Sequence, residues 1–386
     1  MPKVNVDIQS DVLKWAVSQV DEDQLGTKMM ADIKLWIDGT KRPTFNQIEA
    51  FSRKANIPLG YLFLETPPDE DIALLDYRTI DSFELSKPSR NLIDTIHEMD
   101  SIQNWMREYR LEIGWNPLPF VCSMNSISDI DAIVLAIRKE LELEKSWYED
   151  FSGAYDAFKF VRSLLEKNGV IVMLNGVVGG NTHRVLSIEE FRAFAMVDKY
   201  APLIFINNSD SQGAKLFSLF HEIAHIWIGE NDLFNDRRNN QNVKPIEVLC
   251  NAVASELIVP YSEFANKWNG SQIEDVRARI SEVASIFNCG ESVIARKALD
   301  ARFINSALYS AVIDDAINAY KELRNKQKSS GGNYYNTVVS RLDGCFVRAL
   351  CDSVNNGRTT LTEACRLTNT NRITFPEIAS RFGGVV

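Results

Sequence analysis

The amino-acid sequence predicts an α+β protein that is mainly helical and contains one small β-sheet. Three observations predict this class. Apolar residues recur at the helical spacing of about 3.6 residues through most of the chain. Between residues 170 and 207 the pattern changes to short apolar or alternating runs that are typical of strands. The hydrophobic fraction is 45% over 386 residues, which is enough for a sizeable core and suggests two to three domains.

Residues 1–68 are predicted to form a small helical module. Helical periodicity is clear in DVLKWAVSQV, and DEDQLGTKM, ADIKLWIDG and PTFNQIEAFSRKAN continue as further short helices. Pro43 lies at a helix start and Gly39 directly after a helix end, which are positions that these two residues favour. Pro67 and Pro68, followed by acidic residues, mark the end of the module.

Residues 69–300 are predicted to form a second domain that contains the sheet. Three helices are predicted before the sheet, over 91–113, 130–143 and 155–167. Three strands, each bounded by Gly, Asn or Asp, are predicted over 170–175, 191–198 and 201–207.

Further helices are predicted after the strands. One covers 212–229 and has Gly229 as its C-cap. The next covers 245–259 and is stopped by Pro260, and a helix–turn–helix pattern follows between 273 and 300.

Residues 301–386 are predicted to be a C-terminal helical segment. The stretch KQKSSGGN, over 326–333, is polar and rich in glycine and serine, so it is predicted to be a flexible linker. A final helical pattern covers 334–382.

The net charge of −10 and the six scattered cysteines limit the functional classes. A wholly electrostatic nucleic-acid binder would be basic, so any DNA contact must come from a local module. The cysteines form no C-x-x-C pair, which argues against a cysteine-held zinc or a disulfide framework and favours a reducing compartment. Because the chain has no apolar signal region and no run of about 18 apolar residues, we expect a cytoplasmic protein.

The stretch LFSLFHEIAHIWIGE contains two of the chain's four histidines. His221 and His225 are one helical turn apart, so both imidazoles project from the same helix face. That separation allows both to bind one zinc ion at about 2.0–2.1 Å. Glu222 lies about 100° around the helix, where it can take a proton from the water that zinc activates.

Two buried core histidines with an incidental glutamate are the alternative interpretation. Burying two imidazoles and a carboxylate among side chains such as Phe217 and Phe220 is costly without a compensating cation. The strand predicted over 201–207 precedes this helix and is expected to offer an edge for an extended peptide. Both observations favour a catalytic metal site.

The helix predicted over 245–259 supplies candidates for a third ligand. Glu247 would complete a His₂Glu set that leaves one position open, as catalytic zinc requires. Asn251, one turn later on the same face, is placed to hydrogen-bond a ligand histidine. Glu256 is the competing third ligand, and it lies about 180° around the helix from Glu247, so the two cannot share a face. The spacing favours Glu247 and leaves Glu256 as the alternative.

With these motifs, the chain resembles the ImmA/IrrE family of zinc metallopeptidases, specifically its longer members with an N-terminal Xre-type helix–turn–helix. The resemblance extends from the N-terminal module to about residue 300. It rests on KRPTFNQIEAFSRKANIPLGYLFLETPPDED, LLDYRT, NGVVGGNTHRVLSIEEFRAF, HEIAH and EVLCNAVASELIVP.

The resemblance implies a zincin-like, specifically gluzincin-like, metallopeptidase core that cuts repressor proteins in bacterial and phage regulation. The family's zinc ligands correspond to His221, His225 and Glu247, and its general base corresponds to Glu222. Some members of the family belong to toxin–antitoxin pairs.

The helix–turn–helix departs from the Xre pattern, because Gly26 replaces the usual alanine and the spacing to Gly39 is short. The candidate DNA-binding residues in this module are Lys28, Lys34, Lys41 and Arg42. These few cations are a small number for DNA contacts, so a structural cap or a protein-docking surface is the alternative.

His183, in GGNTHR, is the other histidine expected near the cleft. It is a candidate catalytic residue that would stabilise the oxyanion formed during peptide cleavage. Tyr200 and Tyr261 compete for that role, and an ordinary loop histidine is the simpler interpretation.

The expected function is therefore that of a zinc-dependent endopeptidase that acts on a repressor-type protein regulator in transcriptional control. The alternative is a non-proteolytic DNA-binding regulator, or the antitoxin of a toxin–antitoxin pair. In that case the N-terminal module would contact promoter DNA and the C-terminal half a cognate toxin.

Overall fold

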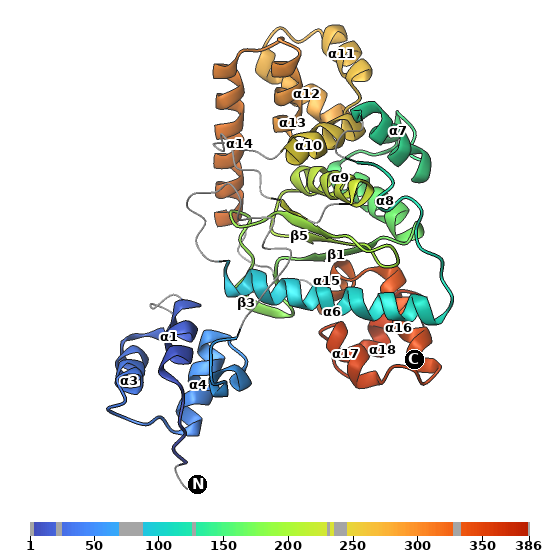
Figure 1. Cartoon of the computed structure of the whole chain (residues 1–386). Coiled ribbons are helices and arrows are strands. Elements are labelled where there is room, and N and C mark those ends of the chain that lie inside the picture. Colours follow the sequence, from blue (N-terminus) through green and yellow to red (C-terminus); the bar gives the residue numbers. More distant parts are fainter. Residues whose placement is uncertain are drawn as a thin grey trace. The chain divides into compact units, whose positions relative to one another are not determined.

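The structure is a computed structural model of the chain. It describes residues 4–20, 25–68, 88–125, 129–229, 232–234, 245–326 and 333–384. It is mainly helical with a small sheet, which confirms the predicted α+β class (Figure 1). The chain divides into two compact units, and among the described residues the boundary falls between Thr95 and Ile96, within helix α6 (Arg90–Glu112).

The first unit contains three α-helices and a short 3₁₀ helix among its described residues before α6. They are α1 (Ser10–Ser18), α3 (Thr27–Ile37), α4 (Phe45–Ala55) and η1 (Leu59–Phe63). Their apolar faces enclose a core centred on Leu13, Ile33 and Phe51. Thr44 and Gln47 form a reciprocal capping box, which explains why α4 begins at Phe45, directly after its N-cap Thr44.

The helix boundaries in this module differ from the prediction in one place. Leu25 is helical before Gly26, and ADIKLWIDG together with the last residues of DEDQLGTKM forms one helix, α3, from Thr27 to Ile37. It begins after Gly26, whose φ of 76° is in the left-handed region that favours glycine. The first residues of DEDQLGTKM, 21–24, lie outside the described residues.

The second unit is built around a four-stranded sheet with strand order β1-β5-β4-β6. The strands are β1 (Ile171–Asn175), β4 (Ala193–Met196), β5 (Leu203–Asn207) and β6 (Asp232–Phe234). β1 and β5 are parallel, and β4 is antiparallel to both of its neighbours. A separate hairpin pairs β2 (Val177–Val178) with β3 (Asn181–Val185).

The strand at 201–207 was expected to offer a free edge, and this expectation is wrong. β5 is central, because β1 pairs with one side of it and β4 with the other. The five residues of β5 are all buried, as expected for a strand with covered faces and paired edges. An extended peptide therefore cannot add to β5.

Helices cover both faces of this sheet. Figure 1 shows α9 (Gln212–Ile228) and α10 (Pro245–Ile258) on one side and α6 on the other. On the α9 side, Ile204 and Ile206 belong to the main hydrophobic core. Phe205 alternates with them and stacks on Phe194 with ring centroids 5.1 Å apart. Both faces of β5 are thus used for packing.

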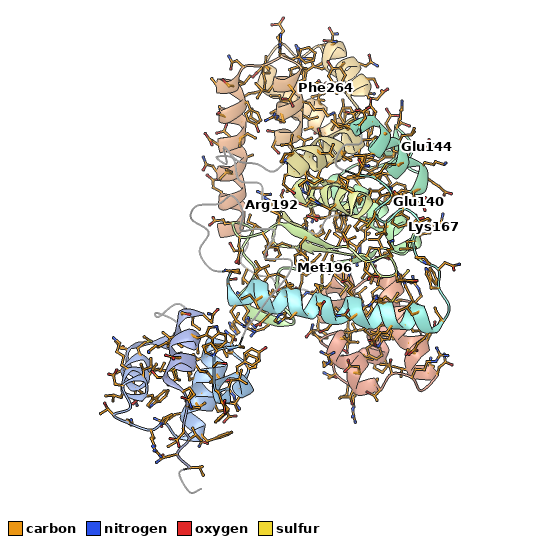
Figure 2. All side chains as sticks on the ribbon, in the orientation of Figure 1. Glu140, Glu144, Lys167, Arg192, Met196 and Phe264 are labelled. Carbon is orange, nitrogen blue, oxygen red and sulfur yellow. The ribbon has the colours of Figure 1, made fainter. Side chains whose placement is uncertain are left out.

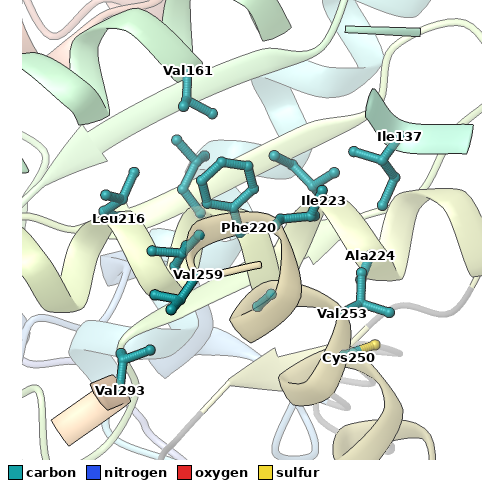
Figure 3. Packing of buried hydrophobic residues seen from close by; sticks show 14 of the residues in the cluster. Ile137, Val161, Leu216, Phe220, Ile223, Ala224, Cys250, Val253, Val259 and Val293 are labelled. Carbon is teal, nitrogen blue, oxygen red and sulfur yellow. The ribbon is translucent and has the colours of Figure 1, made fainter. Parts of the chain in front are cut away.

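The main core surrounds α9. Figure 3 shows Leu216, Phe220 and Ile223 of α9 packed against residues from neighbouring helices. Those helices include α10, α7 (Ile130–Glu140), α8 (Ala154–Lys167) and α13 (Glu291–Asp300). Figure 2 shows how densely side chains fill the space between these layers. Because α9 is buried from residue 218 to residue 228, the polar residues in this range need partners inside the protein.

The ends of α9 are defined by local signals. The Ser211 hydroxyl accepts a hydrogen bond from Ala214 N–H at the N-terminus. Gly229 is the C-cap, as predicted, with a φ of 92°. A Cβ atom at residue 229 would also lie 2.7 Å from Cys122 Sγ, so both backbone conformation and packing require glycine here.

Four further helices belong to the described part of the second unit before residue 327. They are η2 (Trp147–Asp150), α11 (Tyr261–Gly270), α12 (Val276–Ile286) and α14 (Ser306–Lys326). Of the predicted linker at 326–333, residues 327–332 lie outside the described residues. No helix among the described residues is both long and apolar enough to span a bilayer.

Four C-terminal helices belong to the same compact unit as the sheet. They are α15 (Tyr334–Arg341), α16 (Gly344–Asn355), α17 (Leu361–Leu367) and α18 (Thr374–Arg381). Asp343 joins them to the sheet: one carboxylate oxygen accepts Phe346 N–H at 2.8 Å, and the other accepts Val172 N–H of β1 at 3.0 Å. The C-terminal helices therefore satisfy a backbone group on the outer edge of β1.

Two carboxyl groups at this junction, that of the buried Asp343 and that of the partly buried Glu166, predict how stability depends on pH. Burial, followed by the charge of Asp343, raises the pKa of Glu166 to about 7, although Arg162 and Arg348 act in the opposite direction. The folded protein then holds a proton that the unfolded chain releases near pH 4.5. The free energy of unfolding should therefore fall as pH rises from about 4.5 to about 7.

The substitution Glu166→Gln removes this titration. Between pH 4.5 and 7, the free energy of unfolding of the wild type should fall by about 3 kcal/mol because of this group, and we expect Glu166→Gln to remove that fall. Urea unfolding at several pH values measures the effect, and Glu142→Gln on an exposed side chain is the matched control. Parallel pH profiles for wild type and Glu166→Gln would contradict the assignment.

Candidate metal centre

The two histidines of HEIAH face one another inside the protein. His221 and His225 project from the same face of α9, and both side chains are fully buried. Their Nε2 atoms are 3.1 Å apart. Two neutral imidazoles repel each other when both Nε2 lone pairs point into the space between the rings. This arrangement therefore favours a proton or a cation between the two Nε2 atoms.

The carboxylate of Glu247, on α10, faces the same two Nε2 atoms. Its Oε2 lies 3.2 Å from His221 Nε2, and its Oε1 lies 3.2 Å from His225 Nε2. These three residues form a group whose ligand atoms all lie within 4.8 Å of one another. Two ligands at about 2.05 Å from a tetrahedral zinc ion are about 3.3 Å apart. The spacing of the group thus fits a metal of this size.

The electrostatics of His221 and Glu247 also fit a bound cation. Burial acts to lower the pKa of His225, but contacts with Cys250 and Glu247 outweigh it and hold this pKa well above its usual range. Burial lowers the pKa of His221, and the hydrogen bond to Glu247 offsets only part of this effect. Burial acts to raise the pKa of Glu247, but hydrogen bonds to His221 and His225 outweigh it and hold this pKa well below its usual range. Neutral imidazole and ionised carboxylate are the forms that bind zinc.

Asn251 supports the group from one turn further along α10. Its Oδ1 lies 3.0 Å from His221 Nδ1. A hydrogen bond at Nδ1 places the ring proton there and leaves the Nε2 lone pair directed at the centre of the group. The structure therefore brings Asn251 to the position that the sequence predicted.

Glu222 follows His221 on α9 and is fully buried. Burial, and in smaller measure the charge of Glu222, raises the pKa of the Cys250 thiol on α10. A buried carboxylate next to a cation site is suited to accept a proton from water.

Cys250 is a neighbour of the group that the sequence analysis did not identify. It is fully buried on α10, between Glu247 and Asn251, and its thiol interacts with the imidazole of His225. Burial raises the pKa of this thiol, so it stays protonated. The signal in the sequence was its place three residues after Glu247, on the same helix face.

Glu256, the competing third ligand, lies elsewhere. Its Oε2 accepts a hydrogen bond from Lys297 at 2.6 Å, and its Oε1 accepts the Tyr261 N–H at 2.8 Å. The two carboxylate oxygens of Glu256 thus accept hydrogen bonds from α13 and α11. Among the described residues, the carboxylate that faces His221 and His225 is that of Glu247.

His183 is not brought together with the histidine group. It lies on β3 of the separate hairpin, and its side chain is exposed. Tyr261 is also exposed, and Tyr200 lies after β4 in a turn shaped by Asp198. The oxyanion role of His183 stays a prediction, and no contact in the described part of the chain supports it.

The candidate DNA-binding residues lie in the first unit and are all exposed. Lys28 and Lys34 are on α3, and Lys41 and Arg42 follow it. Lys41 pairs with Asp32 at 2.8 Å, and Arg42 pairs with Asp7 at 3.2 Å. Two of the four cations are thus partly neutralised, which weakens the positive surface that DNA would need.

These ion pairs predict a weak salt dependence for any DNA binding by this unit. With two cations available, log K should fall against log salt with a slope of about −2, and Lys34→Ala should reduce the slope by about 1. Binding to an upstream promoter fragment at several salt concentrations measures both values. Lys14→Ala, which removes an exposed lysine paired with Asp11, is the control. An unchanged slope in Lys34→Ala would exclude Lys34 from the interface.

Two family models match parts of the chain. Residues 180–299 match the IrrE N-terminal-like domain, and this range contains α9, α10 and the whole histidine–glutamate group. The match supports a metallopeptidase-type function of the ImmA/IrrE kind. Residues 342–381 match a domain of unknown function, DUF8813. No curated protein and no solved structure matches the chain.

Proposed function

We propose that this chain is a zinc-dependent endopeptidase that cleaves a protein regulator of the repressor type. His221, His225 and Glu247 would hold the zinc ion through His221 Nε2, His225 Nε2 and the Glu247 carboxylate. The observation that carries the proposal is the convergence of these three side chains, within hydrogen-bond distance of one another, inside the matched domain.

The residues of this chain have distinct roles in the proposed reaction. When bound, zinc would supply a Lewis acid that polarises the scissile carbonyl and makes water acidic. Glu222 would accept the proton of the attacking water and pass it to the leaving amine. Asn251 would hold the His221 ring in one orientation through its contact with Nδ1. The apolar residues around α9 would exclude bulk water and strengthen these interactions.

The choice of a protein substrate rests on the resemblance to ImmA/IrrE peptidases and on the presence of a separate N-terminal unit. That unit would bind the regulator or its operator, while the second unit cleaves. The six cysteines are all free thiols, which supports a reducing compartment and hence the cytoplasm.

Metal analysis of the purified chain tests the proposal. We expect about one zinc ion per chain, and we expect His221→Ala to lose it because two remaining ligands cannot hold the ion. His97→Ala, the same change on α6, is the control and should retain the zinc. Full zinc retention in His221→Ala would refute the assignment.

A further inference from the structure

The polar residues buried on α9 share one side of the helix. At about 100° per residue, they fall within an arc of about 120°, which we call the polar stripe. The residues of the polar stripe are Lys215, Ser218, His221, Glu222 and His225. The opposite side of α9 is apolar and packs in the main core, as the labelled Leu216, Phe220 and Ile223 show (Figure 3). Ser218 therefore belongs to the side of α9 that forms the candidate metal centre.

Ser218 lies at the centre of the polar stripe, and its hydroxyl is buried without a partner. The residue is 1% exposed, and Oγ has no hydrogen-bond partner among the described residues. A helical serine can donate to the carbonyl four residues earlier, but Ser218 does not do so. An unpaired buried hydroxyl is costly, so its position inside the protein calls for an explanation.

Two polar neighbours of Ser218 on the stripe are already used elsewhere. The Lys215 ammonium donates to Asn208 Oδ1 at 2.8 Å, and as a donor it cannot accept the Ser218 proton. His221 faces Asn251 through Nδ1 at 3.0 Å and Glu247 through Nε2 at 3.2 Å. Of the polar residues within one turn of Ser218 on the stripe, Glu222 is thus the suitable acceptor.

The geometry of a helix directs Glu222 toward Ser218. Glu222 is four residues further along α9, so the two side chains are neighbours on the helix surface, with Cβ atoms about 5–6 Å apart. Long side chains on a helix slope back over the preceding turn, and for Glu222 this is the turn that contains Ser218. Both residues are buried, so bulk water does not compete for a contact between them.

We propose that Ser218 is a positioning residue for Glu222. Its hydroxyl donates a hydrogen bond to one carboxylate oxygen, directly or through one buried water, and so fixes the orientation of the carboxylate. The other oxygen is then held toward the attacking water, without the cost of reorienting at each turnover. This inference rests on the proposed function, in which Glu222 is the general base.

A double-mutant cycle on the full-length protein at a fixed excess of zinc tests the contact, because neither residue is a proposed zinc ligand. Ser218→Ala removes the donor, and Glu222→Met removes the acceptor at similar side-chain volume. We expect Ser218→Ala to lower the folding equilibrium constant about 10-fold more in the wild-type background than in Glu222→Met, as for a hydrogen bond to a charged group. Urea unfolding of the four proteins measures this difference.

Two further variants separate the contact from packing. Ser218→Thr keeps the hydroxyl, so its coupling to Glu222 should be close to that of the wild type, even where the added methyl group lowers stability in both backgrounds. Ser353→Ala, the same change as Ser218→Ala at a buried serine of α16, is the matched control. Its effect should add to that of Glu222→Met, because the two residues are independent.

Peptide cleavage tests the positioning role itself. The probe is a synthetic peptide that spans a cut mapped in cells producing the wild type. We expect Ser218→Ala to lower kcat about 10-fold with KM and zinc content unchanged, because the change affects only the orientation of the base. Ser218→Thr should recover most of this loss.

Each contrary outcome overturns a specific statement. Additive effects of Ser218→Ala and Glu222→Met on stability would overturn the contact and the inference with it. A wild-type kcat in Ser218→Ala would overturn the positioning role, even with the coupling present. A wild-type chain that contains no zinc and cuts no protein would refute the proposed function, and the positioning role would fall with it whatever the coupling.

Discussion

Replacing Glu222 by glutamine is expected to reduce the rate of peptide cleavage by about 10²- to 10⁴-fold, which is the usual contribution of a general base. The zinc content and the fold should be unchanged. Glu222 is buried beside the histidine group, but it is not a member of that group. Glutamine has nearly the same shape and cannot accept the proton, so the substitution separates chemistry from metal binding.

Proteolysis in cells gives the measurement. N-terminal peptide profiling of cells that produce wild type or Glu222→Gln identifies the cleaved protein, and a peptide spanning the cut then gives the rate. Glu140→Gln, the same change on α7, is the matched control and should cleave like the wild type. If the cuts persist in the zinc-loaded Glu222→Gln protein, Glu222 is not the general base.

The same variant distinguishes the enzyme from the non-proteolytic alternative. If the protein is a regulator or antitoxin that does not cut its partner, the wild type and Glu222→Gln should neutralise the toxin or repress the promoter equally well. A peptidase should lose its effect on the target regulator. An unchanged phenotype with zinc bound would therefore support the alternative function.

Replacing Glu247 by glutamine is expected to weaken zinc binding by about 100-fold or more. Loss of a residue that only hydrogen-bonds a metal ligand costs up to about 100-fold in metal affinity, and a residue that binds the metal directly contributes more. The carboxylate lies 3.2 Å from both Nε2 atoms and is the one negative charge of the three-residue group. An amide at this position leaves two imidazoles and no counter-charge for the cation.

Competition with a zinc chelator of known affinity measures the change. Glu256→Gln is the matched control, since Glu256 lies on the same helix and its oxygens bind Lys297 and Tyr261 N–H. We expect this variant to keep the wild-type zinc affinity. Loss of zinc from Glu256→Gln together with retention by Glu247→Gln would reverse the ligand assignment.

The sequence alone was sufficient for features that depend on neighbouring residues. The helical class, the extent of α9 and its C-cap at Gly229 follow from periodicity and cap preferences within one segment. The common face of His221 and His225 follows from the geometry of a single helix. In each case the determining atoms lie within a few residues of one another.

Tertiary structure decided the features that depend on how distant segments pack. Glu247 and Glu256 were both available in the sequence, and the packing of α10 against α9 turns Glu247 toward the histidines. The strand at 201–207 looked like an edge, but its pairing with β1 and β4 makes it central.

The attachment of the C-terminal helices was likewise not predictable from local sequence. Asp343 caps α16 with one carboxylate oxygen, and its other oxygen accepts a hydrogen bond from Val172 N–H of β1, 171 positions away in the chain. The periodicity of a segment specifies which face is buried, whereas the partner of that face depends on the packing of the whole unit.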